Sequence, residues 1–295
     1  MKILNIGSLN IDYVYQVDDF VAGGETKLSE SMKIFSGGKG LNQSIALKRA
    51  GAEVYHGGLI GRDGLFLKEL LQKEGVNTDF ISTVDESTGH AIIQVNKSGE
   101  NCILLFGGAN QLFAADGIDA ILGSFNKGDY VLLQNEINHM DYIINKAYDL
   151  GLNIILNPSP INDKLKGYPL DKVSTFILNE IEGSELTGMN EAESILKVLI
   201  AKYPNSNFVL TLGSKGVIYG HKEERIAVEA KKVIPVDTTA AGDTFTGYYL
   251  SGILKGKTVK EALELATAAA ALAVTRAGAA PSIPVLSEVL IQPFK

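Results

Sequence analysis

The sequence predicts an α/β fold in which a mostly parallel central sheet lies between two layers of helices and a small antiparallel β-sheet forms a lid. Short, continuous apolar segments alternate along the chain with segments of helical periodicity, which is typical of βαβ units. Two stretches interrupt this rhythm with alternating patterns and no helical segment between them. Of the 295 residues, 45% are hydrophobic and 21% are charged, which allows a large buried core.

The central elements follow one another from the N-terminus. The segments predicted as buried strands are Ile3–Ile6, Val54–Leu59, Val131–Leu133, Ile154–Leu156, Phe176–Leu178 and Phe208–Leu212. The helical segments between them are Leu41–Ala50, Leu65–Glu74, Met140–Leu150 and Ala192–Lys202. Because strands of this kind form parallel sheets that are buried on both faces, and such sheets bind ligands beyond the carboxyl ends of their strands, we expect the functional residues directly after the strands.

The two alternating stretches predict the lid. Tyr13–Val17 and Ala91–Val95 alternate as half-buried strands do, and Asn96–Asn101 has the composition of a hairpin turn. We therefore predict a lid built from residues 11–37 and 88–108. Since the chain has no internal repeat and no proline-rich linker, one domain, 1–295, is expected.

Charge and cysteine content limit the possible partners and location. The chain has 27 Lys and Arg residues against 34 Asp and Glu residues, a net charge of −7, which argues against nucleic acid and anionic lipid and favours a small ligand. Cys102 is the only cysteine, so an internal disulfide is impossible and a cytosolic location is expected. The longest apolar run, Ala268–Val274, is far shorter than the roughly 20 residues that span a bilayer, so we expect no transmembrane segment.

Two common nucleotide-binding motifs are absent. The chain contains no G-x-G-x-x-G fingerprint, which disfavours a nicotinamide-dependent enzyme. The segment Ser251–Thr258 approaches a P-loop, but it begins with serine and follows a helical segment instead of a strand. We interpret Gly256 as the residue that ends this helix, and Thr258 with Glu261 as a capping box that begins the next.

A glycine-rich segment, Gly37–Ser44, begins the first predicted helix. Its glycines allow the backbone to approach a ligand, and Lys39 and Asn42 can form directional hydrogen bonds, as a neutral polyol requires. Asn10 and Asp12 follow the first strand and are further candidates for binding hydroxyl groups. The alternative is structural: a glycine-rich turn, a solvated lysine and residues that form a turn at a strand end.

The strongest local signal is Asp237–Phe245, which precedes a long helical segment. The small residues Ala240, Ala241 and Gly242 at a helix start leave three backbone N–H groups free to face an anion, such as a phosphoryl group in transfer. Asp243, in the same turn, would stay ionised and could accept a proton from a hydroxyl group. The alternative is an aspartate that only caps the helix.

Two further strand ends carry polar residues. The Glu182 carboxylate could organise a hydrated Mg²⁺ ion, and the turn Thr211–Gly216 could lie beneath a purine and its ribose. The structural alternatives are a helix cap at Asn179–Glu182 and a hairpin turn at Thr211–Gly216. The four histidines are not spaced as a metal-binding set, and we expect them to be structural or surface residues; they are His56, His90, His139 and His221.

Together, Gly37–Ser44 and Asp237–Asp243 resemble the two signature motifs of the ribokinase-like, PfkB-type carbohydrate kinases. The resemblance extends from Gly7 to Ser282 and implies the ribokinase-like three-layer α/β/α fold. It implies that Asp243 is the catalytic base and that Ala240, Ala241 and Gly242 form an anion hole. It also implies a ribose-binding set consisting of Asn10, Asp12, Gly38, Lys39, Asn42, Glu136 and Asp243.

The resemblance further implies the nucleotide and metal sites. The residues that would contact ATP are Asn179, Thr211, Gly213, Ser214, Gly216, Gly242 and Thr267. Glu182 would lie near Mg²⁺ and the phosphates. A monovalent cation, K⁺, would act as activator, and several of its ligands would be backbone carbonyls; the matching positions are Asp237, Thr239, Ala273, Arg276, Gly278 and Ser282. Two residues depart from the usual pattern of the family, namely Tyr248, where a small residue is usual, and Thr267, where some members have histidine.

The function implied by the resemblance is ATP-dependent phosphorylation of D-ribose at its 5-hydroxyl group. Another furanose-like substrate, such as fructose, deoxyribose or a nucleoside, is the first alternative. A catalytically silent sugar sensor of the same fold is a second, and the intact Asp243 and Ala240–Gly242 segment argue against it. The lid resembles one that commonly pairs with the lid of a second subunit, which implies a homodimer.

Overall fold

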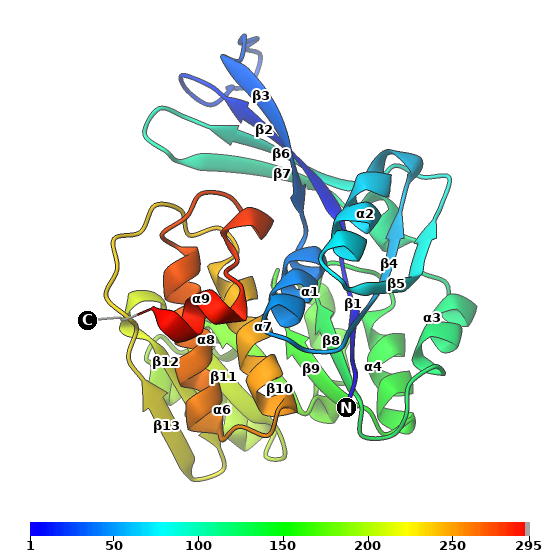
Figure 1. Cartoon of the computed structure of the whole chain (residues 1–295), viewed down its shortest axis with the longest axis vertical. Helices are drawn as coiled ribbons and strands as arrows, with labels where there is room; N and C mark the ends of the chain where they lie inside the picture. The colour runs from blue at the N-terminus through cyan, green and yellow to red at the C-terminus, as the bar shows by residue number, and fades with distance from the viewer. Residues whose placement is uncertain (293–295) are drawn as a thin grey trace.

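A nine-stranded sheet crosses the centre of the computed structural model, which describes residues 1–292 (Figure 1). The last three residues of the predicted domain, 1–295, lie outside the described range. The strand order is β13-β12-β11-β10-β9-β8-β1-β4-β5, and every pair from β11 to β5 is parallel. The strands are β1 Ile3–Ile6, β4 Val54–Ile60, β5 Asn77–Thr83, β8 Tyr130–Gln134, β9 Asn153–Asn157, β10 Thr175–Asn179, β11 Asn207–Thr211, β12 Val217–His221 and β13 Glu224–Val228.

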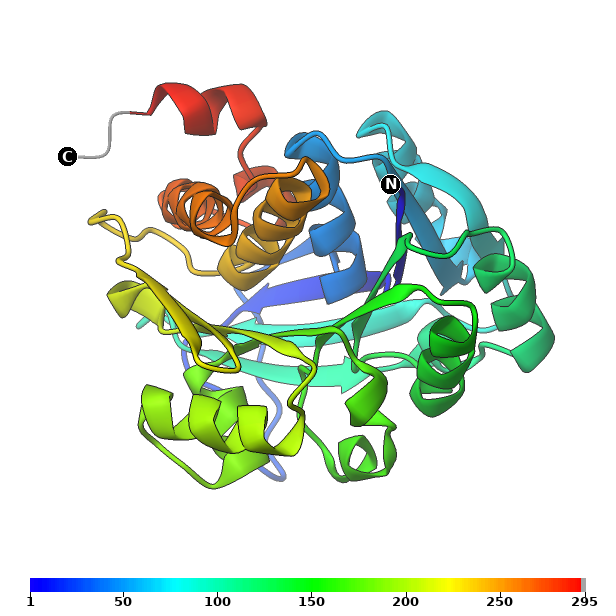
Figure 2. The ribbon, with the colours of Figure 1, turned by 90° about the horizontal axis from the view of Figure 1, so that it is seen from below.

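Helices cover both faces of this sheet, as Figure 2 shows, so the predicted three-layer fold is confirmed. One face carries α1 Lys39–Arg49, α2 Leu65–Lys73, α7 Ala241–Leu254, α8 Val259–Ala273 and α9 Leu286–Ile291. The other carries α3 Ala115–Leu122, α4 Met140–Asp149, α5 Glu180–Thr187 and α6 Ala192–Lys202. Within residues 1–292, no helix is both long enough and apolar enough to cross a membrane.

The side chains of the central strands alternate between the two helical layers. Leu132 and Ile155 pack against the layer that contains α1 and α7, whereas their neighbours Val131 and Ile154 pack against the layer that contains α4 and α6. Since the strands are buried on both sides, each reads as a continuous apolar run in the sequence. This burial makes the sheet a rigid base for the polar residues that follow its strands.

A second sheet forms the predicted lid and projects from the body in Figure 1. Its strand order is β3-β2-β6-β7, with β2 Asn10–Gln16, β3 Ser31–Gly37, β6 Gly89–Val95 and β7 Asn101–Phe106. The two hairpins are antiparallel as expected, but the central pair, β2 and β6, is parallel. The reason is that β2 and β6 are each the first strand of a hairpin, and both run from the body of the protein toward the tip of the lid. Where the two hairpins pair side by side, these two strands therefore run in the same direction.

The interpretation of Ser251–Thr258 as helix ends is confirmed. Gly256 has a φ of 76°, the left-handed conformation that commonly follows a helix. Thr258 caps α8, and its N–H donates a hydrogen bond to the Glu261 carboxylate over 2.8 Å. This segment is therefore a helix–helix connection and not a phosphate-binding loop.

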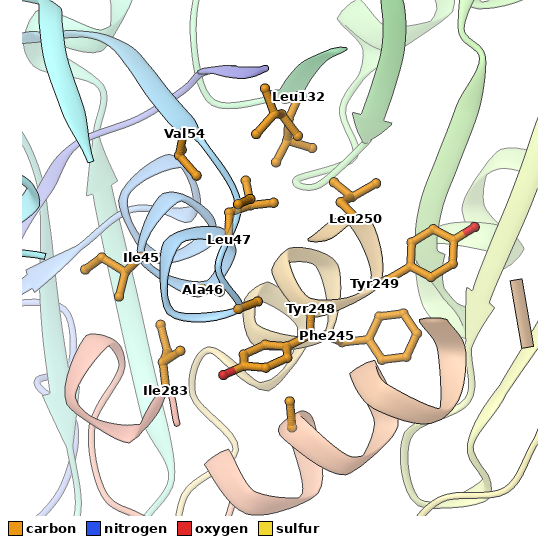
Figure 3. Close-up of a cluster of buried hydrophobic side chains, with 14 of the residues drawn as sticks. Ile45, Ala46, Leu47, Val54, Leu132, Phe245, Tyr248, Tyr249, Leu250 and Ile283 are labelled. Atoms are coloured by element: carbon orange, nitrogen blue, oxygen red, sulfur yellow. The ribbon is translucent and has the colours of Figure 1, made fainter. Parts of the chain in front are cut away.

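Helices α1 and α7 cross in unusually close contact, and this crossing positions the two motifs of the sequence. A Cβ atom added to Gly247 of α7 would lie only 2.4 Å from Cβ of Ala46 and 2.6 Å from the backbone nitrogen of Leu47. Figure 3 shows Ala46 and Leu47 beside α7. Tyr248, whose size departs from the family pattern, is fully buried at this crossing, and its hydroxyl donates a hydrogen bond to the carbonyl of Pro284 over 2.7 Å.

Candidate active site

Polar residues follow five neighbouring parallel strands at one edge of the sheet. In sheet order, β11 ends at Thr211, β10 at Asn179 and β9 at Asn157, while Glu136 follows β8 and Asn10 follows β1. Because these strands are adjacent and parallel, the five side chains emerge at the same edge. The structure thus gathers these residues at the carboxyl ends of the strands, where the sequence predicts the functional residues.

The glycine-rich segment brings the start of α1 to this edge. Gly38 caps α1 with a φ of 94°, which disfavours a side chain. A Cβ atom added to Gly40 would lie 2.5 Å from the backbone nitrogen of Ser8, so the helix begins directly against the loop after β1. As a result, Lys39 and Asn42 lie next to the strand ends.

The N-terminus of α7 lies opposite. Ala240 caps this helix in the left-handed conformation, with a φ of 58°, and Ala241, Gly242 and Asp243 form its first turn. The Ala241 N–H donates a hydrogen bond to the Thr238 carbonyl over 3.2 Å, so the expectation of three free N–H groups is wrong for this one. The tight turn that precedes the helix uses it.

This helix start faces a cavity of about 250 Å³. Lys39, Asn157, Asn179, Glu182 and Thr211 line the cavity together with Ala240, Ala241, Gly242 and Asp243. The structure thus brings the first motif, the second motif and three of the strand ends around one space.

Asp243 is the third residue of α7, and its carboxylate does not cap the helix. It is only 8% exposed. Its Oδ2 accepts a hydrogen bond from Nδ2 of Asn42 over 3.1 Å, and its Oδ1 accepts one from Nε2 of Gln43 over 2.9 Å. Both donors belong to α1, so the crossing of α1 and α7 orients this carboxylate.

Lys39 lies among several acidic groups. Burial opposes the charged form of its side chain, but three carboxylates outweigh this effect and raise the pKa of Lys39. These carboxylates belong to Asp243, Glu136 and Glu182. A cation in this position can balance negative charge that enters the cavity.

The expected sugar-binding residues on the lid side are linked to one another. Glu136 accepts hydrogen bonds from the Ser8 hydroxyl and from the Lys39 N–H, and burial raises its pKa. Burial and the negative charge of Glu136 raise the pKa of Asp12 to about 7. Oδ1 of Asn10 accepts a hydrogen bond from Asn110 over 2.7 Å.

Asn179 and Glu182 form a capping box at the start of α5, as the structural alternative predicted. The Asn179 N–H donates to Glu182 Oε2 over 3.0 Å, and the Glu182 N–H donates to Asn179 Oδ1 over 2.9 Å. Both residues nevertheless line the 250 Å³ cavity. The structural role and a role in the site are compatible here.

A larger cavity of about 510 Å³ adjoins the first and shares four lining residues with it, Thr211, Thr238, Ala241 and Gly242. It contains the remaining residues expected to contact a nucleotide, which are Gly213, Ser214, Gly216 and Thr267. Its other walls are mainly apolar, formed by residues such as Ala230, Val233, Pro235, Phe245, Ala270 and Val274. An aromatic base fits such a surface.

Asp237 connects two loops that carry residues expected to bind a monovalent cation. Its Oδ1 accepts a hydrogen bond from the Thr239 N–H over 2.9 Å, and its Oδ2 accepts one from the Gly278 N–H over 2.8 Å. Burial acts to raise the pKa of Asp237, but these hydrogen bonds outweigh it and hold the pKa below its ordinary value. Both loops are therefore fixed beside the N-terminal turn of α7.

The side chains of Arg276 and Ser282 are engaged in other contacts, and Ala273 and Gly278 have no polar side chain that could bind a cation. The Arg276 guanidinium pairs with Glu288 at 2.8 Å, the Ser282 hydroxyl donates to the Ala279 carbonyl, and the Ala273 carbonyl accepts from the Arg276 N–H. Any cation at this place would be held mainly by backbone oxygens.

Some polar residues near Asp243 were not singled out as candidates from the sequence, and Gln43, Gln134 and Asn157 are the ones connected to it by hydrogen bonds. Asn157 and Gln134 end β9 and β8, so the rule about strand ends contained the signal for both. Gln43 lies within the glycine-rich motif, but its contact with Asp243 spans 200 residues of sequence and has no local signature.

Known proteins resemble the chain along nearly its entire length. A sequence model described as pfkB family carbohydrate kinase matches residues 1–286. Ribokinase of Haemophilus influenzae is 36% identical over 297 residues, which cover 97% of this chain and 96% of the relative. Deoxyribokinase of Salmonella typhi is 30% identical over 299 residues, covering 98% and 97%. The structure of Arabidopsis thaliana ribokinase complexed with ribose and ATP has a TM-score of 0.86 at 30% identity and covers 98% of this chain and 97% of its own.

Proposed function

The chain belongs to the pfkB family of carbohydrate kinases, and we propose that it transfers the γ-phosphoryl group of ATP to the 5-hydroxyl group of D-ribose. One observation carries the proposal: the buried Asp243 carboxylate lies at the N-terminus of α7, between a polar set at the lid and an apolar cavity that suits a nucleotide. A kinase of this type acts mainly by alignment and electrostatic stabilisation, and this arrangement provides both.

We propose that ribose occupies the space between the lid and α1. Its hydroxyl groups would bind Asn10, Asp12, Lys39, Asn42 and Glu136, with the Gly38 backbone in close approach. These residues carry carboxylate, amide and ammonium groups, which match a ligand with several hydroxyl groups. Because a polar site leaves its own groups unpaired when a hydroxyl is missing, each missing contact costs about 1–3 kcal/mol.

In the transfer step, Asp243 accepts the proton of the 5-hydroxyl group while the sugar oxygen forms a bond to the γ-phosphorus of ATP. The bond between the γ-phosphorus and the bridging oxygen breaks, and ADP leaves with that electron pair. The free N–H groups of the Ala240–Gly242 turn and the Lys39 ammonium group would stabilise the charge on the transferring group. The products are ribose 5-phosphate, ADP and a proton.

We propose that Thr211, Gly213, Ser214, Gly216 and Thr267 bind the base and ribose of ATP. These residues line the 510 Å³ cavity, and because it shares a wall with the smaller cavity, the phosphates of a nucleotide bound there would extend toward Asp243. Asn179 would contact the phosphates. Thr267 is 6% exposed, and its hydroxyl has no partner within residues 1–292, so it is the candidate that decides the preference for the base.

The donor set also fits the two proposed metal ions. The Glu182 carboxylate lines the 250 Å³ cavity and, together with phosphate oxygens and water, would hold Mg²⁺, which prefers oxygen ligands of this kind. Mg²⁺ supplies neutralisation of charge on the β- and γ-phosphates when bound. K⁺ would be held at the loops that Asp237 joins, mainly by backbone carbonyl oxygens of residues such as Thr239, Ala273 and Gly278.

We further propose that two copies of the chain pair through their lids to form a homodimer. A cytoplasmic location is also proposed, because ATP is available there as the phosphoryl donor. Ile34, Ile92 and Leu104 lie in one row across the four lid strands, with Tyr13 between Ile34 and Ile92, and are 53%, 38% and 68% exposed. An apolar row of this kind on an open sheet favours pairing with a second copy. Light scattering tests the dimer, and Leu104→Lys should shift the mass toward the monomer while wild type stays dimeric.

The reaction is tested by measuring ADP release across a sugar panel. We expect kcat/KM to be higher for D-ribose than for 2-deoxyribose, fructose or adenosine. Asp243→Asn should lower kcat by about two to four orders of magnitude, because it removes the base while it keeps the shape of the site. If kcat/KM is higher for 2-deoxyribose, the family assignment stands, but the proposed substrate is 2-deoxyribose instead of ribose. A variant that keeps more than about a tenth of kcat would remove Asp243 from the base role.

A further inference from the structure

A connected group of buried side-chain amides lies behind Asp243. Asn5 of β1, Gln43 of α1 and Gln134 of β8 have no exposed surface. Nε2 of Gln43 donates to Oδ1 of Asp243 over 2.9 Å and faces Oδ1 of Asn157 at 3.3 Å. Nε2 of Gln134 donates to Oε1 of Gln43 over 2.7 Å and to Oδ1 of Asn5 over 3.0 Å. The group links the centre of the sheet to the carboxylate.

Contacts with the backbone fix the direction of the Asn5 and Asn157 amides, and these two orient the Gln43 and Gln134 amides between them. Nδ2 of Asn5 donates to the carbonyl of Gly40 over 2.8 Å, which turns its oxygen toward Gln134. Nδ2 of Asn157 donates to the carbonyl of Ile177 over 2.9 Å, which turns its oxygen toward Gln43. A rotated Gln43 amide would place its oxygen against the Asp243 carboxylate and lose the bond from Gln134. Only one orientation of Gln43 therefore satisfies its neighbours.

The group is also more costly than an apolar filling of the same space. Burial of an amide is unfavourable unless all of its polar atoms are paired, and Oε1 of Gln134 has no partner within residues 1–292. Apolar side chains would avoid this cost. A function that needs the amides explains why the space is polar.

We propose that Gln43, oriented by Gln134 and Asn157, is a positioning residue that holds the Asp243 carboxylate in its reactive orientation. The Gln43 amide donates its hydrogen bond to Oδ1 of Asp243. The other oxygen, Oδ2, accepts a hydrogen bond from Asn42 and is the one that would meet the sugar hydroxyl. The proposal rests on the proposed function, in which Asp243 accepts the proton of the substrate.

Gln43→Met tests the proposal, because methionine keeps the length of the side chain and removes its amide. We expect kcat to fall about 10- to 100-fold, since an error of about 1 Å in the reacting geometry can cost 10²-fold, while KM for ribose and ATP stays within about threefold. Gln134→Met should produce a smaller fall in kcat, because Gln43 then keeps its bond to Asp243 but loses the contact that fixes its direction.

A double-mutant cycle separates this role from a merely structural one. In an Asp243→Ala background no carboxylate remains to be positioned, so adding Gln43→Met should change the residual kcat less than about twofold. Ser251→Ala is the matched control. The Ser251 hydroxyl is fully buried in α7 and donates to the Ala50 carbonyl at the far end of α1, so its loss loosens the same pair of helices away from Asp243.

An unchanged kcat in Gln43→Met, an equal loss in both backgrounds, or an equal loss in Ser251→Ala would each overturn the positioning role. The two proposals can fail separately. If Asp243→Ala is inactive and Gln43→Met is fully active, only the positioning role falls. If Asp243→Ala keeps more than about a tenth of kcat, the base role falls and the positioning role falls with it.

Discussion

Replacing Gly247 by alanine should damage both stability and catalysis, because this glycine sets the distance between α1 and α7. The added Cβ would lie 2.4 Å from Cβ of Ala46, whereas carbon atoms pack at about 3.5–4.0 Å, so the helices must separate by roughly 1 Å. Backbone atoms of Ala46 and Leu47 are almost as close, so a rotamer change cannot relieve the clash. Overpacking of this kind costs about 1–3 kcal/mol.

The same displacement reaches the active site. Gln43 of α1 donates to Asp243 of α7 over 2.9 Å, and a separation of about 1 Å would take this distance beyond hydrogen-bond range. We therefore expect Gly247→Ala to lower kcat about 10- to 100-fold in addition to its effect on the free energy of unfolding.

Urea unfolding and steady-state kinetics, measured on the same preparation, test this reasoning. Gly117→Ala is the control, because Gly117 lies on the exposed face of α3 with no atom within 4 Å of an added Cβ. It should stabilise the protein by about 0.5 kcal/mol and leave kcat unchanged. If Gly247→Ala matches wild type in both measurements, the close crossing does not control the site.

Two further predictions concern pH and cations. The pKa of Asp12 is raised to about 7 by burial and by Glu136, so the folded state loses stability relative to the unfolded state as pH rises from about 4 through 7. The Asp12→Asn variant has no carboxyl group at this position and therefore lacks this loss of stability. Its melting temperature, measured without sugar, should rise relative to that of wild type between pH 5 and pH 8. A difference in melting temperature that stays constant over this range would contradict the prediction. Replacing K⁺ by tetramethylammonium at constant ionic strength should lower kcat by removing the ion from the loops joined by Asp237, and equal rates in both salts would argue against a cation site there.

The sequence predicted the parts of the fold that depend on local pattern. The apolar runs at β1, β8, β9, β10 and β11 were identified because a strand buried on both faces leaves a continuous apolar signal. Strands β5, β12 and β13 were not predicted. The two edge strands are β5 and β13, where partly exposed residues interrupt the apolar signal. Strand β12 lies between β11 and β13 and is antiparallel to both, outside the βαβ rhythm that identified the other strands. The hairpin turn considered for Thr211–Gly216 is what joins β11 to β12.

Contacts between distant parts of the chain could not be predicted in the same way. The parallel pairing of β2 with β6 depends on how two hairpins leave the body, which neither hairpin encodes locally. Gln43 is a polar residue near a helix start, where solvent exposure is the usual expectation, yet the crossing of α1 over α7 buries it. The role proposed for it depends on its contacts with Asp243 and Gln134, which only the structure places beside it.

At several positions a structural role is compatible with the proposed functional role. Asn179 and Glu182 cap α5, and this cap brings the Glu182 carboxylate to the wall of the cavity. The oxygens of a capping carboxylate have more acceptor positions than the cap uses, so a hydrated cation can still approach. The turn at Gly213–Lys215 likewise joins two strands and lines the larger cavity. Helix starts and strand ends are the places where backbone groups lack partners, so the side chains that satisfy them also stand where a ligand binds.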